Sequence, residues 1–169
     1  MRFLIIFIFL LSNSFANEVP DIKNLIINKE QKKYDSLMFL DAKNQKIELS
    51  NYRDNLIILN FWATWCLPCK EEMPSLDILL NNDKLNNLKI FPINVGKDSP
   101  QKSEEFFKKL NIKNLEIYFD PPSTLAKKLS LRGIPTTIIF NKEGKEFARI
   151  IGSINFEDKR FIDWLSFYN

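Results

Sequence analysis

The chain has 169 residues, enough for one domain with a full hydrophobic core and short for two. Hydrophobic residues make up 45% and charged residues 27%, which is ordinary for a soluble globular protein. The formal net charge of +3 is too small to indicate a nucleic-acid partner, and lysine pairs such as Lys108–Lys109 are interpreted as solvated surface. We therefore expect no nucleic-acid binding.

Residues 1–16 have the pattern of a secretory signal peptide. One basic residue, Arg2, precedes the apolar run of residues 3–11, and small residues follow at Ser14 and Ala16. We expect cleavage after Ala16 and export to the periplasm or another extracytoplasmic compartment. The alternative is an uncleaved membrane anchor, although the apolar run is shorter than the roughly 20 residues that span a bilayer.

The next segments predict an arm, a hairpin and a buried strand. Residues 17–35 are polar and lysine-rich, and we expect them to form a loosely held N-terminal arm before a folded domain of residues 36–169. Residues 36–49 predict a β-hairpin that turns at residues 42–46. Residues 56–62, "LIILNFW", form a nearly continuous apolar run, which is typical of a central strand buried on both faces.

Helices and strands alternate through the rest of the chain. After Cys66 the pattern is helical, because Met73, Leu76 and Leu79 recur on one face. Further strands are predicted at 87–96, 115–119, 136–140 and 145–152, and further helices after Ser99, after Ser123 and around 161–168. This order predicts an α/β fold with a mixed central sheet covered by helices on both faces.

Both cysteines of the chain, Cys66 and Cys69, lie close together at the start of the first predicted helix. A disulfide between them would close a loop too short to stabilise the fold much. The chain contains no histidine, so a zinc site would need carboxylates or a second subunit, and every Cys–His nucleophile scheme is excluded. The same absence weighs against a copper carrier. We therefore expect redox chemistry, with no metal or other cofactor.

The two cysteines are expected to differ in exposure. Cys66 should be exposed at the N-terminus of the helix, where unpaired backbone N–H groups favour a thiolate. Pro68 falls in the first turn, where proline is tolerated. Cys69 follows one turn later and should be more buried.

Three segments carry a resemblance to a known family. "FWATWCLPC" at residues 61–69, the following Pro74 and "GIPTT" at residues 133–137 resemble the thioredoxin superfamily. The signal peptide, the N-terminal hairpin and residues 94–110 are similar to the TlpA/ResA/CcmG group of exported thiol–disulfide oxidoreductases. The resemblance runs from about residue 36 to the C-terminus, and it implies a thioredoxin-like sheet with an N-terminal β-hairpin extension.

The resemblance also implies roles for single residues. Cys66 matches the attacking thiol, and Cys69 matches the resolving thiol. Pro135 matches a cis-proline that faces the disulfide across the active site. A cis bond there would turn the Ile134 backbone outward, ready to pair with an extended substrate segment.

The remaining implied site residues surround this pair. Trp65 matches an aromatic residue beside the nucleophile, and Trp65 and Thr136 are expected to contact substrate together with Ile134. Glu72 matches a glutamate that ResA-type proteins place near the thiols, and its spacing from Cys69 puts both on one helix face. The alternative is that Glu72 is a solvated helix residue. Asn60 occupies the position at which cytoplasmic thioredoxins carry a buried aspartate. The resemblance therefore leaves Glu72 as a candidate proton acceptor in place of that aspartate.

The resemblance implies a periplasmic reductant of selected protein disulfides, such as those of apocytochrome c haem-binding motifs or copper-site thiols. It would act as a monomer and receive electrons from a membrane thiol donor. One alternative is a peroxide reductase of the same fold, but its Pro-x-x-x-Thr-x-x-Cys box is absent, because Leu59 and Ala63 stand at the matching positions. Another is a redox-inactive module that binds a partner beside Pro135.

Overall fold

A computed structural model of the chain describes residues 19–169. The expected signal peptide, its cleavage site and the alternative membrane anchor lie outside the described residues. Among residues 19–169, no helix combines the length and apolar character needed to cross a membrane.

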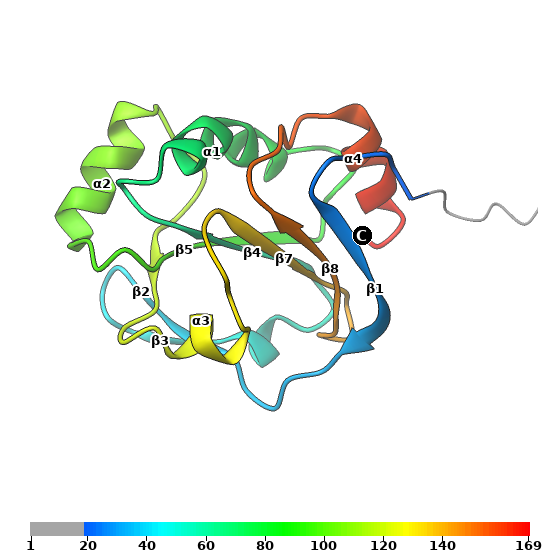
Figure 1. Cartoon of the computed structure of the whole chain (residues 1–169), viewed down its shortest axis with the longest axis horizontal. Coiled ribbons are helices and arrows are strands. Elements are labelled where there is room, and N and C mark those ends of the chain that lie inside the picture. Colours follow the sequence, from blue (N-terminus) through cyan, green and yellow to red (C-terminus); the bar gives the residue numbers. More distant parts are fainter. Residues whose placement is uncertain (1–18) are drawn as a thin grey trace, which may run out of the picture.

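The centre of the molecule is one eight-stranded mixed sheet with the strand order β1-β8-β7-β4-β5-β6-β2-β3 (Figure 1). β4 pairs in parallel with β5, and β5 with β6, whereas the other neighbours are antiparallel. The strands are β1 Leu25–Lys32, β2 Met38–Asp41, β3 Lys46–Glu48, β4 Leu56–Trp62, β5 Leu88–Asn94, β6 Tyr118–Phe119, β7 Thr136–Phe140 and β8 Glu146–Ile151. The helices are α1 Leu67–Leu79, α2 Pro100–Lys109, α3 Thr124–Lys128 and α4 Lys159–Ser166, and residues Leu49–Tyr52 form a 3-10 turn.

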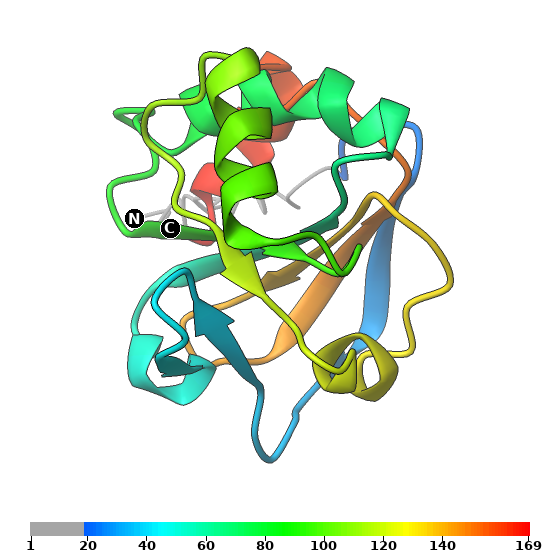
Figure 2. The ribbon, with the colours of Figure 1, turned by 90° about the vertical axis from the view of Figure 1, so that its left-hand side faces the viewer.

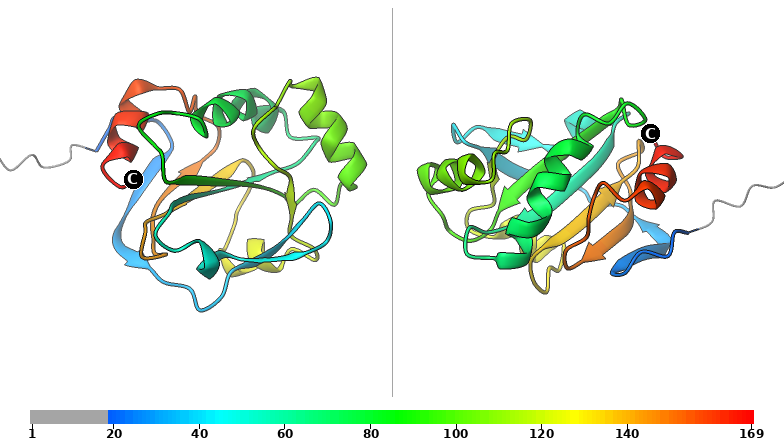
Figure 3. Two further views of the ribbon diagram at one scale, coloured as in Figure 1. Left: turned by 180° about the vertical axis from the view of Figure 1, so that it is seen from behind. Right: turned by 90° about the horizontal axis from the view of Figure 1, so that it is seen from above.

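Helices cover both faces of this sheet, as the sequence predicts. α1, α2 and α4 lie side by side over one face (Figure 3), and α3 lies on the opposite face (Figure 2). All seven residues of β4 are buried. Ile58 and Trp62 join the core beneath α1, α2 and α4, while Ile57, Leu59 and Phe61 join the core on the side of α3. The alternating apolar side chains of this strand therefore pack toward the helices on both faces of the sheet. The end of the strand sets the point where α1 begins.

The N-terminal segment differs from the expected loose arm. β1 lies within residues 17–35 and pairs antiparallel with β8 at the edge of the sheet. Buried Glu146 of β8 accepts hydrogen bonds from the Tyr34 hydroxyl (2.6 Å) and from Asn28 Nδ2 (2.9 Å), and Arg149 Nη2 donates to it as well (2.8 Å). The segment has a polar sequence because most of its edge strand is exposed, yet backbone pairing and a buried carboxylate hold it in place.

The other predicted elements are present, with local differences. The hairpin at residues 36–49 is confirmed as β2 and β3, and the strand expected at 115–119 is reduced to β6. Ser123 precedes α3 but makes no capping hydrogen bond, because its backbone is left-handed with φ of 72°. The Asp120 carboxylate accepts from the N–H groups of Leu125 (2.8 Å) and Ala126 (2.7 Å) in its place.

Candidate active site

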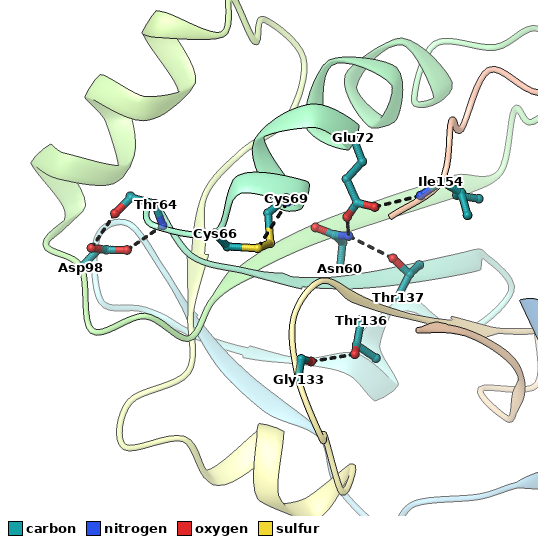
Figure 4. The surroundings of a disulfide bond; sticks show 10 residues. All are labelled: Asn60, Thr64, Cys66, Cys69, Glu72, Asp98, Gly133, Thr136, Thr137 and Ile154. Atoms are coloured by element: carbon teal, nitrogen blue, oxygen red, sulfur yellow. Dashed lines mark hydrogen bonds between the residues drawn. A yellow bond between two sulfur atoms is a disulfide. The ribbon is translucent and has the colours of Figure 1, made fainter. Parts of the chain in front are cut away.

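Cys66 and Cys69 form a disulfide at the N-terminus of α1 (Figure 4). β4 ends at Trp62, a short turn follows, and Cys66 is the N-cap residue of the helix. Its sulfur accepts a hydrogen bond from the Cys69 N–H at 3.3 Å. Pro68 lies in the first turn, where its missing N–H leaves no helical hydrogen bond unmade. The Cys66 sulfur therefore lies where the free N–H groups of a helix end favour negative charge on it.

The disulfide is more buried than the sequence predicts. Cys69 is fully buried and Cys66 is only 5% exposed, so the expectation of an exposed Cys66 is wrong for the oxidised protein. The bond turns the Cys66 sulfur toward Cys69, and both join the core beneath α1. The neighbouring Trp65 and Leu67 are instead 67% and 65% exposed. A partner that reaches the sulfurs would thus meet an apolar rim first.

The loop before β7 carries Pro135, and the Ile134–Pro135 peptide bond is cis. Ile134 is half-buried and packs against the same core cluster as the two cysteines. The Pro135 carbonyl accepts a hydrogen bond from the Gly152 N–H at 2.9 Å. Thr136 is buried, and its hydroxyl donates a hydrogen bond to the Gly133 carbonyl at 2.8 Å, which holds the loop in place.

Glu72 is buried, with 2% of its surface exposed, so the alternative of a solvated helix residue is wrong. Asn60 Nδ2 donates to Glu72 Oε1 at 2.8 Å and also to the Thr137 hydroxyl oxygen at 3.0 Å. The Ile154 N–H donates to Glu72 Oε2 at 3.4 Å. Figure 4 shows Glu72 reaching from α1 toward Asn60 on the sheet below, one turn after Cys69.

Burial raises the pKa of Glu72 from 4.5 to about 7, although the hydrogen bonds from Asn60 and Ile154 oppose this effect. Asn60 Oδ1 is buried and has no hydrogen-bond partner among the described residues. The Asn60 amide can therefore form a hydrogen bond with Glu72 in either protonation state. Its N–H donates to the carboxylate, and after rotation of the amide its carbonyl accepts from the protonated acid. The carboxyl can exchange a proton near neutral pH.

A polar network that the sequence did not indicate holds the turn before Cys66. Asp98, in the loop between β5 and α2, accepts from the Thr64 N–H (3.0 Å) and from the Thr64 hydroxyl (2.8 Å). Lys102 Nζ and Asn94 Nδ2 donate to the same carboxylate at 2.6 and 3.0 Å. Burial alone would raise the pKa of Asp98, but the hydrogen bonds from Lys102, Thr64 and Asn94 outweigh it and lower the pKa to about 2. The spacing of Asp98 and Lys102, four residues apart at a helix start, is the one local signal that could have pointed to this network.

Gly96 lets this loop approach the active-site turn closely. A Cβ atom at this position would lie 2.5 Å from the Ala63 Cβ and 3.0 Å from Trp65 Nε1. The 2.5 Å distance to the Ala63 Cβ is too short for any side chain, so the close contact between the two loops requires glycine.

The site combines two cysteines, three residues apart at a helix N-terminus, with a cis-proline loop packed against the same core and a buried carboxyl whose pKa is near neutrality. The cysteine pair can exchange electrons with a partner's thiols or disulfide. On a mixed sheet covered by helices, this site defines a thiol–disulfide oxidoreductase with a thioredoxin-like fold. Residues 17–145 match the model of the AhpC/TSA family, and the chain belongs to this family.

Known proteins agree with this class. The chain is 33% identical over 118 residues to the thiol-disulfide oxidoreductase ResA of Geobacillus kaustophilus, which covers 70% of this chain and 67% of that protein. It is 31% identical over 114 residues to ResA of Bacillus subtilis, covering 68% and 63% of the two chains. Among solved structures, a secreted thiol-disulfide isomerase from Corynebacterium glutamicum superposes with a TM-score of 0.70 at 23% identity, covering 87% of this chain and 95% of that one. That likeness shows the shared fold.

Proposed function

We propose that the protein is an exported reductant of selected protein disulfides. The observation that carries this direction is the surroundings of Cys66: the dipeptide between the cysteines, Leu67-Pro68, offers no positive charge, and the buried Glu72 lies one turn beyond Cys69. The potential of such a dithiol depends on how strongly the protein stabilises the thiolate. A nearby carboxylate opposes a second negative charge, so the dithiol should give up its electrons readily.

The position of Cys66 at the N-cap of α1, with Cys69 inside the first turn of the helix, supports Cys66 as the attacking thiol and Cys69 as the resolving thiol. The Cys66 thiolate attacks a sulfur of the substrate disulfide and forms a mixed disulfide, and one substrate thiolate leaves. Cys69 then attacks Cys66, the Cys66–Cys69 disulfide forms, and the second substrate thiolate is released. Two electrons pass from the protein to the substrate. Trp65 and the Ile134 backbone contact the substrate segment that carries the disulfide.

The substrates that we propose are extracytoplasmic, such as the disulfides of apocytochrome c haem-binding motifs or of copper-site thiols. The similarity to the TlpA/ResA/CcmG group and the signal-peptide pattern of residues 1–16 support this assignment. A reductant in an oxidising compartment must be recharged, so the second partner is a membrane thiol donor that reduces the Cys66–Cys69 disulfide. The protein itself acts as a monomer.

The test of direction is equilibration of the protein with dithiothreitol or glutathione redox buffers, with the fraction of free thiols scored by alkylation. We expect a midpoint potential nearer to that of thioredoxin, about −270 mV, than to that of a strong oxidant, about −120 mV. A midpoint at the oxidant's end of the scale would mean that the protein makes disulfides and would reverse the proposal.

One alternative is a peroxide reductase of the same fold. Against it, Leu59 and Ala63 occupy the positions of the proline and threonine of the peroxidase box, and both are buried. Consumption of hydrogen peroxide by the reduced protein at a rate comparable to insulin reduction would support this alternative. Failure to reduce insulin would favour a redox-inactive binding module.

A further inference from the structure

A cavity of about 460 Å³ lies beyond the cis-proline loop, on the side of the sheet that carries α3. Its walls are the segment from α3 to β7, the edge strand β1 and its neighbour β8. Four basic side chains line it: Lys32, Lys128, Arg132 and Arg149. We call it the basic cavity.

The basic cavity carries an uncompensated positive charge. Arg149 is paired with the buried Glu146, which also holds Tyr34 and Asn28. The other three cations are exposed, and none of them forms an ion pair with a carboxylate among residues 19–169. No aspartate or glutamate lines the cavity. A concave surface lined by one sign of charge concentrates its field and attracts the opposite charge.

The basic cavity adjoins the cis-proline loop of residues 133–135. Arg132 and Thr136, on either side of Gly133–Pro135, both line it, and Thr136 pairs with Ile151 of β8. Ile134, between them, packs against the core cluster that contains Cys66 and Cys69. A polypeptide that lies along Ile134 can therefore reach the cavity without leaving the surface.

The rim of the basic cavity suits a polypeptide better than a small anion. Two isoleucines, Ile26 and Ile151, line it and are 48% and 47% exposed. The three cations that form no ion pair among the described residues come from three separate segments, at the end of β1, at the end of α3 and in the loop after it, and the Lys128 Nζ donates a hydrogen bond to the Ser36 carbonyl. Positive charges that are spread in this way, with apolar side chains between them, match carboxylates distributed along a polypeptide.

We propose that the basic cavity binds an acidic segment of the protein whose disulfide is exchanged at Cys66–Cys69. This inference rests on the proposed function and adds a rule of substrate selection to it. The acidic segment lies a few residues from the partner's cysteines, and its carboxylates meet Lys32, Lys128 and Arg132 while its backbone passes Ile134.

The test uses synthetic peptides that share one disulfide-closed loop and differ in the flanking residues. Three glutamates or three glutamines are placed on either the N-terminal or the C-terminal side, and the rate of reduction by the dithiol protein is measured. We expect the glutamate peptide of one orientation to react faster than its glutamine counterpart, by about threefold to tenfold at low salt, because each exposed ion pair contributes modestly. Raising the ionic strength should remove the difference.

Arg132→Glu combined with Lys32→Glu should abolish the preference for glutamate. Lys89→Glu is the matched control, because Lys89 is exposed at the start of β5, at the end of the strand away from the redox turn. This control should keep the full preference. Both variants should retain the wild-type rate with the glutamine peptides, which shows that they are folded.

The outcomes separate the inference from the function on which it rests. Equal rates for glutamate and glutamine peptides, with both reduced, would overturn the acidic-segment proposal and leave the reductase intact. Reduction of neither peptide would overturn the reductase. Binding of wild-type protein to vesicles of anionic phospholipid that is lost in the double variant, without any peptide preference, would assign the basic cavity to a membrane surface and contradict the proposal.

Discussion

Replacement of Glu72 by glutamine should change how the stability of the oxidised protein depends on pH. Burial raises the pKa of this carboxyl from 4.5 to about 7, so between these values the folded protein holds a proton that the unfolded chain releases. The resulting stabilisation is fully present below pH 4.5 and is lost as the pH rises through 7. A change from 4.5 to about 7 corresponds to a loss of about 3 kcal/mol in the free energy of unfolding.

The pH window of this effect is unusually clear. The chain contains no histidine, the side chain that ordinarily titrates between pH 5 and 8. Asp98, whose pKa is lowered to about 2, loses its stabilising contribution only as the pH falls below its unfolded value near 3.8. The disulfide keeps both cysteines from titrating.

The measurement is urea unfolding of the oxidised protein at pH 5, 6, 7 and 8. Glu72→Gln should resemble the wild type at pH 5 and be more stable than it by about 2–3 kcal/mol at pH 8, because glutamine carries no buried charge. The control is Glu71→Gln, which changes an exposed carboxylate on the same helix and should follow the wild type throughout. A wild-type stability that stays flat across this range, or a Glu72→Gln curve parallel to it, would refute the reasoning.

Three further results are expected. Cys69→Ser should accumulate mixed disulfides with partner proteins and Cys66→Ser should trap none, and equal trapping on non-reducing gels would contradict their roles. Asp98→Asn should lower the free energy of unfolding by about 1–3 kcal/mol in urea titrations, because it weakens the charged hydrogen bonds to the turn before Cys66, whereas the exposed Glu104→Gln should not. Protein from the native host should begin at Asn17 on N-terminal sequencing, and an intact N-terminus in the membrane fraction would indicate an anchor.

The parts of the fold that could be predicted from the sequence are those that depend on local residue patterns. The apolar run of β4 predicted a strand buried on both faces, and Ser99 followed by Pro100 predicted the start of α2, where the Ser99 hydroxyl accepts from the Lys102 N–H. The position of Cys66 at the start of a helix, with Cys69 one turn later, followed from the same kind of pattern. Each of these features depends on residues within one or two turns of the chain.

The parts that the sequence did not predict depend on contacts between distant residues. Asp98 and Thr64 are 34 positions apart, and Tyr34 and Glu146 are 112 apart. No local pattern shows that a polar N-terminal segment will meet a buried carboxylate on β8, a strand near the other end of the sequence. An exposed edge strand is polar for the same reason that a loose arm is polar, so composition alone could not separate the two.

Glu72 was predicted in part from a local pattern and depends in part on distant contacts. The sequence shows the spacing of Glu72 from Cys69. The burial of Glu72 and its contacts with Asn60 and Ile154 depend on the sheet and on the segment after β8. When a thiol donor attacks Cys66, the sulfur that leaves is that of Cys69, which is fully buried and needs a proton. In this chain, which contains no histidine, we propose Glu72 as the group that supplies the proton. Burial, which raises the pKa of Glu72 to about 7, lets a carboxyl one turn away change charge in the range where histidine ordinarily does so.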